Sequence, residues 1–304
     1  MLGTALVLIL MSLCSCDSKS VNMNSNIDVQ GHRGCRGLRP ENTILAFKKA
    51  IDIGVNTLEL DVVVNKFNDV IISHEPFFNH EIATNPKGEL ITEENEKQFN
   101  MYQMSIEEIQ SFDVGMKIHP KFPTQKKVKA IKPTLKEMVI AIEAYVKEEN
   151  LDLPEYNIEI KRVKENDGIF HSEMKTFADV VCAEIKKLGI AKRSTMQCFD
   201  IETLQYVYKK YPEFRLVLLI ANRIPFEENI SELGFKPWAY SPYFQLISNE
   251  LIEYGRKENI KVIPWTVNEP EDILNMIAIG VDGIISDYPD RVVELIEASK
   301  NSKK

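Results

Sequence analysis

The chain has 304 residues, of which 44% are hydrophobic and 27% are charged, and its formal net charge is −8 at pH 7. This length is sufficient for one large α/β barrel or for two ordinary domains, and the composition is typical of a soluble globular protein. The negative charge argues against a nucleic-acid partner, because binding to a phosphate backbone requires a basic surface. A protein of this charge binds a phosphate-bearing ligand only where it provides a local cation or a metal ion.

The N-terminal segment differs in composition from the rest of the chain. Residues 1–13 are uncharged and mostly apolar. This run is too short to predict a membrane span, so it is interpreted as the core of a signal peptide. The sequence Leu-Cys-Ser-Cys at 13–16 resembles a bacterial lipoprotein cleavage site. We therefore expect residues 1–16 to be a lipoprotein signal peptide, Cys16 to be the lipidated first residue, and residues 17–26 to be a polar tether.

This interpretation also predicts where the protein is found. A lipid at Cys16 would attach an exported lipoprotein to a membrane of the cell envelope, so we expect it to be periplasmic or attached to the outer membrane. No Lys or Arg precedes the apolar run, although a signal peptide normally carries one there. Plain secretion and an uncleaved anchor therefore stay open as alternatives.

Three cysteines lie outside this segment. Their number and spacing fit neither a disulfide framework nor a metal site. They are expected to be ordinary buried or free thiols: Cys35, Cys182 and Cys198.

From residue 27 onward, short β-rich runs alternate with amphipathic helical runs. The strand-like runs cover residues 27–32, 56–64, 156–161, 194–199, 214–220, 238–242, 261–267 and 283–288. The helix-like runs cover residues 43–54, 133–149, 170–189, 201–211, 226–234, 248–259, 270–280 and 289–300. Such alternation predicts a parallel sheet. Eight repeats favour a closed (β/α)₈ TIM barrel, here over residues 27–300, and an open doubly wound sheet is the alternative.

A further strand-like run, 69–75, interrupts this alternation. The turn at 65–68 that separates it from the run 56–64 is too short for a parallel crossover. The sequence therefore predicts an antiparallel hairpin at the end of the second strand, which would return His74 to the level of Asp61. Residues 76–132 are far longer than an ordinary loop. We expect an insertion over the barrel mouth, with a small helix near residues 105–112.

Three carboxylates lie near the ends of the second and third barrel strands, which is where barrel active sites lie. Glu59 and Asp61 are two residues apart on one strand, so they point to the same side, and Glu159 follows on the next strand. Converging carboxylates repel one another unless a cation lies between them. Oxygen ligands without cysteine favour Mg²⁺ or Ca²⁺. We therefore expect one divalent cation, although each carboxylate taken alone could be an ordinary solvated strand end.

Two histidines are placed on the same face. His32 follows the first strand and His74 ends the hairpin run, and two imidazoles can serve as a general acid and a general base near neutral pH. The neighbouring fixed cations Arg33 and Lys161 suit an anionic, phosphate-bearing substrate. The remaining histidines are expected to be structural or solvated: His80, His119 and His171.

Six motifs in the chain resemble one known family. They are GHRG with PENTILAF at 31–47, LELDV at 58–62, His-Glu at 74–75, EIK at 159–161, WTVN at 265–268 and GVDGIISDYP at 280–289. Together they closely resemble the glycerophosphodiester phosphodiesterases, from about residue 29 to residue 289. The resemblance implies a (β/α)₈ hydrolase with a divalent metal that releases sn-glycerol 3-phosphate and an alcohol, most specifically the activity of EC 3.1.4.46. It also implies a route in which the glycerol 2-hydroxyl attacks the phosphorus and water then opens a cyclic phosphate.

The resemblance also assigns residues to roles. It implies His32 and His74 as the acid–base pair, Glu59, Asp61 and Glu159 as metal ligands, Arg33 and Lys161 as phosphate-binding cations, and Phe199 and Trp265 as walls around the glycerol. Glycines beside His32 are expected to let the backbone approach the substrate closely. Either Asn42 or Thr43 is expected to cap the following helix, and Glu41 either orients Arg33 or is solvated.

The chain departs from the family pattern in three places. It has Glu75 where the family usually has Asp after the histidine, Cys198 where it usually has Ser, and no Arg-Thr-Thr-like sequence after the hairpin. The differences at Glu75 and after the hairpin concern the choice of substrate more than the type of reaction. Two other functions stay open as alternatives: a glycoside hydrolase, since barrels with paired acids perform that chemistry, and a non-catalytic lipoprotein that binds a phosphorylated ligand. The sequence predicts neither the alcohol head group, nor Ca²⁺ against Mg²⁺, nor the oligomeric state.

Overall fold

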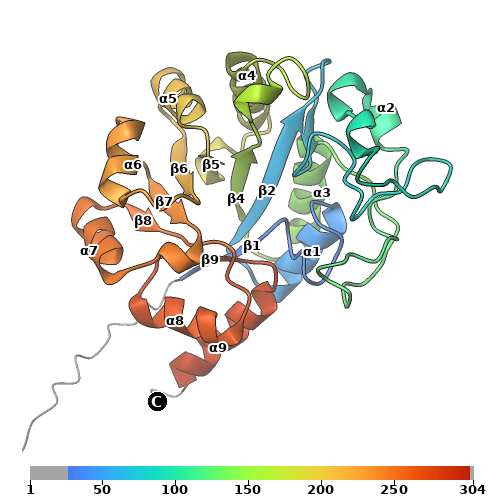
Figure 1. Cartoon of the computed structure of the whole chain (residues 1–304). Helices are drawn as coiled ribbons and strands as arrows, with labels where there is room; N and C mark the ends of the chain where they lie inside the picture. The colour runs from blue at the N-terminus through green and yellow to red at the C-terminus, as the bar shows by residue number, and fades with distance from the viewer. Residues whose placement is uncertain (1–26, 302–304) are drawn as a thin grey trace, which may run out of the picture.

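A computed structural model describes residues 27–301, which form a parallel β-barrel inside a ring of helices (Figure 1). The barrel strands are β1 (Asp28–Gly31), β2 (Thr57–Val64), β4 (Glu155–Ile160), β5 (Ser194–Cys198), β6 (Arg215–Ile220), β7 (Ala239–Pro242), β8 (Lys261–Val262) and β9 (Gly283–Ser286). They are hydrogen-bonded in the order β8-β7-β6-β5-β4-β2-β1-β9, and every one of these pairs is parallel. The predicted (β/α)₈ barrel is confirmed. The predicted leader (1–16), with Cys16, and the tether (17–26) lie outside the described residues.

Backbone hydrogen bonds also bring the two end strands together. Asp282 N–H donates to the carbonyl oxygen of Val262 at 2.9 Å, and Ile285 N–H donates to that of Pro264 at 3.0 Å. The predicted strand 261–267 is too long, because β8 ends at Val262. Pro264 has no N–H to offer a sheet ladder. Residues beyond β8 nevertheless follow β9, since Val267 N–H donates to Ile285 at 2.9 Å.

The helices match the predicted runs closely. They are α1 (Ile44–Ile53), α3 (Leu135–Glu148), α4 (Met174–Lys187), α5 (Ile201–Lys210), α6 (Phe226–Leu233), α7 (Asn249–Glu258), α8 (Pro270–Ile279) and α9 (Pro289–Asn301). Thr43 rather than Asn42 caps α1, since its hydroxyl accepts the backbone N–H of Ala46. Helix α4 begins at Met174 rather than at residue 170, because Gly168 N–H donates to the carbonyl of His171 in a preceding turn. No helix within residues 27–301 is long and apolar enough to cross a membrane.

The alternation of side chains along β2 positions the site. Leu58, Leu60 and Val62 belong to the hydrophobic cluster between the strands and the helices. Glu59 and Asp61 point to the opposite side, into the barrel, because successive strand residues face opposite ways. All eight residues of β2 are buried, so these carboxylates are held in a poorly solvated interior. The three cysteines expected to be ordinary thiols are free and buried: Cys35, Cys182 and Cys198.

The predicted hairpin is present. Strand β3 (Val70–Ile72) pairs antiparallel with the end of β2, with Val62 opposite Ile72. Ser73 N–H then donates to the carbonyl oxygen of Asp61 at 3.0 Å. His74, the next residue, therefore lies at the level of Asp61, as the turn length predicted.

The insertion 76–132 lies at one side of the barrel, near α1 and α3 (Figure 1). It contains the 3₁₀ turns η1 (Glu96–Gln98) and η2 (Met101–Gln103) and the short helix α2 (Ile106–Ile109). Its own hydrophobic cluster packs against Val63 and Ile71 of the hairpin, and Phe78 stacks on Phe112 with ring centroids 3.8 Å apart. The insertion is thus anchored to the face of the β2–β3 hairpin that carries Val63 and Ile71.

Candidate active site

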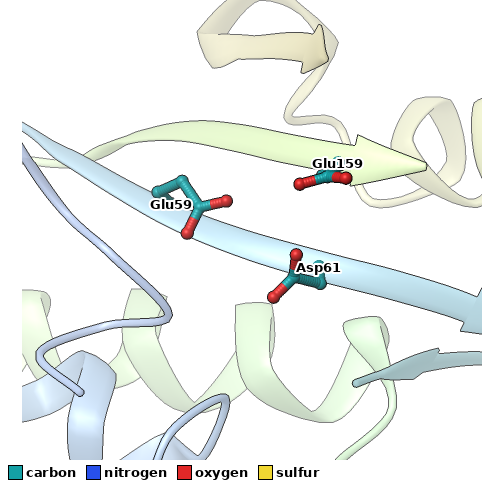
Figure 2. Close-up of side chains that lie close together, drawn as sticks. All are labelled: Glu59, Asp61 and Glu159. Atoms are coloured by element: carbon teal, nitrogen blue, oxygen red, sulfur yellow. The ribbon is translucent and has the colours of Figure 1, made fainter. Parts of the chain in front are cut away.

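Three carboxylates converge at the C-terminal ends of two neighbouring strands. Figure 2 shows Glu59 and Asp61 on β2 turned toward Glu159 on β4. Asp61 and Glu159 are register partners in the parallel pair β2–β4. One oxygen from each of the three side chains lies within 4.8 Å of the others, and all three residues are buried. The predicted convergence is therefore present, and a solvated strand end is ruled out for each of them.

The electrostatics of this triad call for a cation. Burial and the charge of Asp61 raise the pKa of Glu59 well above its usual range. Burial also raises the pKa of Glu159, against the opposing effect of Lys161. Burial acts to raise the pKa of Asp61 as well, but His74 and the nearby cations lower it overall. Oδ1 of Asp61 is buried and has no hydrogen-bond partner among the described residues. Buried carboxylates with an oxygen that accepts no hydrogen bond fit a hard divalent cation.

Polar groups behind the triad fix its orientation. Oε1 of Glu59 accepts from Nε2 of Gln197 at 2.7 Å, and its Oε2 accepts from the backbone N–H of Arg33 at 2.8 Å. Oδ2 of Asp61 accepts from Nδ2 of Asn42 at 2.8 Å. Glu59 and Asp61 thereby each keep one face toward the protein. The other face is available for a cation.

His32 is held by a carboxylate from the far end of the chain. Its Nδ1 lies 2.6 Å from Oδ1 of Asp287, and Oδ2 of Asp287 accepts from Nδ2 of Asn268 at 2.8 Å. Burial lowers the pKa of His32, and Asp287 opposes that shift only in part. A neutral His32 donates from Nδ1 to Asp287 and keeps its Nε2 lone pair as an acceptor. This arrangement suits a general base.

His74 has its own carboxylate partner. Nδ1 of His74 lies 2.7 Å from Oε1 of Glu75, and Nε2 lies 3.1 Å from Nζ of Lys161. Lys161 also donates to Oε1 of Glu159 at 2.7 Å and lies 3.7 Å from Oδ1 of Asp61. The lysine thus joins the histidine to the triad. The longer acid at position 75 reaches the imidazole.

The turn that carries His32 and Arg33 is built by tight packing. Arg33 has a positive φ of 50°, and its Nη1 donates to Oε1 of the buried Glu41 at 2.7 Å. Glu41 therefore orients Arg33, and the solvated alternative is wrong. A Cβ on Gly34 would lie 2.8 Å from Cβ of Ala46, and one on Gly31 would collide with the Gly34 carbonyl. The glycines let the turn pack on itself and on α1, and the expectation that they let the backbone approach the substrate stays a prediction.

A cavity of about 190 Å³ lies over the triad. Phe199 and Trp265 form one wall, with ring centroids 5.5 Å apart in an edge-to-face arrangement. Every predicted site residue except the buried Asp61 lines this cavity: His32, Arg33, Glu59, His74, Glu159, Lys161, Phe199 and Trp265. None of the residues 76–132 lines it within the described structure, so the insertion stands beside the barrel mouth rather than across it.

Two other cavities differ in their position. One of about 330 Å³ adjoins the site and shares Arg33, Arg36 and His74 with it. A larger one, of about 520 Å³, is lined by residues where strands begin, such as Asp28 and Thr57. That larger cavity lies at the end of the barrel opposite the triad, whereas barrel enzymes place catalysis at the carboxyl ends of the strands.

Comparison with known proteins decides the family. Residues 32–291 match the model of the glycerophosphoryl diester phosphodiesterase family. The chain belongs to this family. Its reaction class is the hydrolysis of glycerophosphodiesters, and the glycoside hydrolase alternative is set aside.

Relatives of this phosphodiesterase family cover nearly the whole barrel. A glycerophosphodiester phosphodiesterase of Caldanaerobacter subterraneus subsp. tengcongensis is 30% identical over 271 residues, which is 88% of this chain and 97% of that protein. The crystal structure of a glycerophosphoryl diester phosphodiesterase from Silicibacter pomeroyi superposes with a TM-score of 0.80 at 26% identity, covering 90% of this chain and 94% of that one. A phosphodiesterase from Oleispira antarctica, solved with the product sn-glycerol-3-phosphate, shares the fold with a TM-score of 0.69 at 18% identity, covering 90% and 97%.

Sequence reasoning gave no role to several residues of this phosphodiesterase site. Asp287 and Gln197 were placed at strand ends without a function, and Glu75 was noted only as a departure. The signal for Gln197 is its register opposite Glu159 in the β4–β5 pair, which points it into the barrel beside the triad. His119 was set aside as structural or solvated; it is buried and lines the adjoining cavity.

Proposed function

We propose that this protein hydrolyses glycerophosphodiesters to sn-glycerol 3-phosphate and an alcohol at the cavity over the triad, the activity of EC 3.1.4.46. One observation carries the proposal: two histidines, each hydrogen-bonded through Nδ1 to a carboxylate, line the same small cavity as the acidic cluster and Lys161. Such a set offers proton transfer and charge stabilisation to a phosphodiester. The sn-glycerol-3-phosphate bound to the Oleispira antarctica phosphodiesterase supports the same product here.

The substrate would be held by its phosphate and by its glycerol. Arg33 and Lys161 line the cavity and supply fixed positive charge for the phosphoryl oxygens. Phe199 and Trp265 offer an apolar wall for the carbon chain of the glycerol. Nε1 of Trp265 donates to the carbonyl of Ser241 at 2.9 Å. That bond fixes the indole, so the wall is preorganised.

Glu59, Asp61 and Glu159 would hold one divalent cation, Ca²⁺ or Mg²⁺. When bound, such an ion would offset most of the negative charge of the triad and draw electron density from a phosphoryl oxygen. Oδ1 of Asp61, which accepts no hydrogen bond, and the raised pKa of Glu59 support this assignment. Gln197 and Asn42 then serve to hold the carboxylates in place.

His32 would act as the general base. Its Nδ1 proton is committed to Asp287, so the free Nε2 would take the proton of the glycerol 2-hydroxyl. The alkoxide oxygen would then attack the phosphorus while the bond to the leaving alcohol breaks. The product of this step is a cyclic phosphate, which water would open with the proton transfers reversed.

His74 would act as the general acid. Of the two histidines, only His74 also lines the adjoining 330 Å³ cavity, so it lies on the side where the alcohol would leave. In the ligand-free arrangement Lys161 lies 3.1 Å from its Nε2. A bound phosphate would compete for that lysine. Nε2 would then be free to carry a proton and to donate it to the leaving oxygen. Glu75 would stabilise the positive charge of the imidazole while it is protonated.

We also propose that the protein is a lipoprotein anchored at Cys16. Strand β1 begins at Asp28 and runs toward His32, so the chain enters the barrel at the end opposite the triad. An anchor that precedes Asp28 by a short tether would attach the barrel by that end. The active site would then face away from the membrane, toward water-soluble diesters.

The test is release of glycerol 3-phosphate by purified residues 17–304. Glycerophosphocholine, glycerophosphoethanolamine and glycerophosphoinositol would each be supplied with Ca²⁺, Mg²⁺ or EDTA. We expect release that EDTA abolishes. A folded protein that binds metal and releases nothing from any of these diesters would contradict the proposal and favour a non-catalytic binding role.

A further inference from the structure

The cavity of about 330 Å³ beside the active site is shaped jointly by the barrel and the insertion. Arg33, Arg36 and His74 separate it from the cavity over the triad. Beyond them, its walls include Glu41 and Glu75, whose carboxylates pair with Arg33 and His74, and residues of the insertion, among them Asn79, Glu81 and His119. Its volume is within the range of ligand pockets, which are roughly 300–1,000 Å³. A group that leaves the phosphorus past His74 enters this space.

His119 lines this cavity and carries a buried hydrogen-bond donor. The residue is 1% exposed, and its Nδ1 accepts the backbone N–H of Lys121 at 3.2 Å. A neutral imidazole that accepts at Nδ1 carries its proton on Nε2. That Nε2 lies 3.7 Å from Oε2 of Glu41, beyond hydrogen-bond distance, and has no hydrogen-bond partner among the described residues. A buried donor left unpaired costs free energy, so a ligand oxygen that accepts from it is favoured.

The remaining wall offers both donors and acceptors. Oδ1 of Asn79 accepts the backbone N–H of Glu81 at 2.7 Å, and the amide nitrogen of the same side chain is a donor. The carboxylate of Glu81 lies 3.7 Å from Nζ of Lys121, whose side chain is 65% exposed. An exposed ion pair of this kind is weak. The Glu81 carboxylate is therefore available to accept from a ligand.

The lining excludes two classes of head group. Among the described residues that line the cavity, Ile82 is the only hydrophobic one, and none carries a phenyl, phenol or indole ring. A quaternary ammonium is recognised chiefly by aromatic faces, and an acyl chain requires an apolar wall. Neither feature is present. A hydroxyl group, in contrast, both donates and accepts, and so matches the mixture of His119, Asn79 and Glu81.

We propose that this cavity binds the leaving alcohol and that the preferred alcohol is an uncharged polyol such as glycerol or inositol. His119 Nε2–H would donate to one hydroxyl oxygen, and the Glu81 carboxylate would accept from another. The inference rests on the proposed hydrolysis of glycerophosphodiesters. It adds the class of head group and the two residues that select it.

The test compares three diesters that share the glycerol 3-phosphate half. The kcat/KM values of the full-length protein for glycerophosphoinositol, glycerophosphoglycerol and glycerophosphocholine would be measured with saturating metal. We expect both polyol diesters to exceed the choline diester by about tenfold or more, the scale of one to two hydrogen bonds made only by the polyols.

The variants are His119→Ala, His119→Gln and Glu81→Gln, and the matched controls in the insertion are His80→Gln and Glu93→Gln, at residues that do not line the cavity. We expect His119→Ala and Glu81→Gln each to lower kcat/KM for the polyol diesters roughly tenfold, with little change for the choline diester. His119→Gln retains an N–H donor and should recover part of the loss. The controls should match the parent protein on all three substrates.

Several outcomes would overturn the inference. Equal efficiency toward all three diesters, or an equal loss on all three in the variants, would refute polyol selection while leaving the proposed hydrolysis intact. Absence of turnover on every diester would refute the proposed hydrolysis, and the inference with it. If His119→Ala fails to fold, as judged by circular dichroism, Glu81→Gln decides alone, because its partly exposed side chain is not part of the hydrophobic cluster.

Discussion

Nδ1 of His32 and Oδ1 of Asp287 lie 2.6 Å apart, although 255 residues separate them in the chain. The contact forms where β1 and β9 lie side by side, with Gly31 opposite Ser286. It brings together the residue that follows the first barrel strand and the residue that follows the last. Closure of the barrel thus creates the pair that defines the tautomer of His32.

Replacement of Asp287 by asparagine should leave the tautomer of His32 no longer fixed with its proton on Nδ1. An amide can donate to Nδ1, which would place the imidazole proton on Nε2, where the base needs a lone pair. We expect Asp287→Asn to lower kcat by roughly 10²-fold or more with little change in KM. Steady-state kinetics on a glycerophosphodiester measures both. Asp290→Asn, at an exposed carboxylate in the first turn of α9, is the control and should leave kcat unchanged. An unchanged kcat in Asp287→Asn would remove this pair from the mechanism.

The two histidines should differ in how they respond to the leaving group. We expect His32→Ala and His74→Ala each to lower kcat for a natural diester by about 10²-fold or more, the usual scale for a lost acid or base. A p-nitrophenyl ester of glycerol 3-phosphate leaves without protonation, because p-nitrophenolate is a good leaving group. His74→Ala should therefore recover most of its activity on that ester, while His32→Ala should not. Recovery in both variants, or in neither, would contradict the assigned roles.

The pH dependence of kcat/KM should follow His32. Burial lowers the pKa of this imidazole, so its basic form persists to a lower pH than for a free histidine, whose pKa is about 6.5. We expect the acid limb of the pH profile to lie below that value. Asp287 raises the pKa of His32 in part, so the residual activity of Asp287→Asn should show an acid limb shifted further to lower pH. A shift in the opposite direction would show that another group controls the limb.

Metal binding should stabilise the fold through the triad. A ligand at 100 times its dissociation constant adds about 2.7 kcal/mol to the free energy of unfolding. We expect Ca²⁺ or Mg²⁺ to raise the Tm of the parent protein and EDTA to reverse the effect. Glu159→Gln should abolish the increase.

The variant Glu59→Gln provides a second test of the same metal site. Burial and Asp61 disfavour the charge on Glu59, and Glu59→Gln removes that charge. We therefore expect the Tm of this variant in EDTA to equal or exceed that of the parent protein. The increase in Tm on adding metal should be lost. Calorimetric scans with and without metal measure both quantities. A metal-dependent increase that survives in Glu59→Gln and in Glu159→Gln would place the cation elsewhere.

The proposed anchor predicts a change of location without a change of chemistry. We expect Cys16→Ser to release the protein from the membrane fraction while kcat and KM toward a soluble diester stay the same. Fractionation of cells followed by an activity assay measures both. The control is a serine substitution at the neighbouring Cys14, which should leave the protein in the membrane fraction. Retention of Cys16→Ser in the membrane would contradict the lipoprotein interpretation.

Local patterns were sufficient for much of this architecture. The alternation along LELDVVV predicted that Glu59 and Asp61 face one way, because neighbouring strand residues point to opposite sides. The short turn at 65–68 predicted the antiparallel return that brings His74 to the level of Asp61, because so few residues cannot form a crossover. The expected cap at Asn42 or Thr43 likewise predicted the start of α1. Each of these conclusions depends on residues close together in the chain.

The tertiary structure decided the contacts between distant segments. Sequence alone did not pair His32 with Asp287 or Glu59 with Gln197, because those contacts depend on the register and closure of the barrel. The packing of Gly34 against Ala46 of α1 was likewise not predicted from the sequence. The cavity lined by His119 could not be predicted from the sequence either, because it forms only where the folded insertion meets the β1–α1 turn. Chemical type and strand face are local properties, whereas pairing partners and cavities are set by how the whole chain packs.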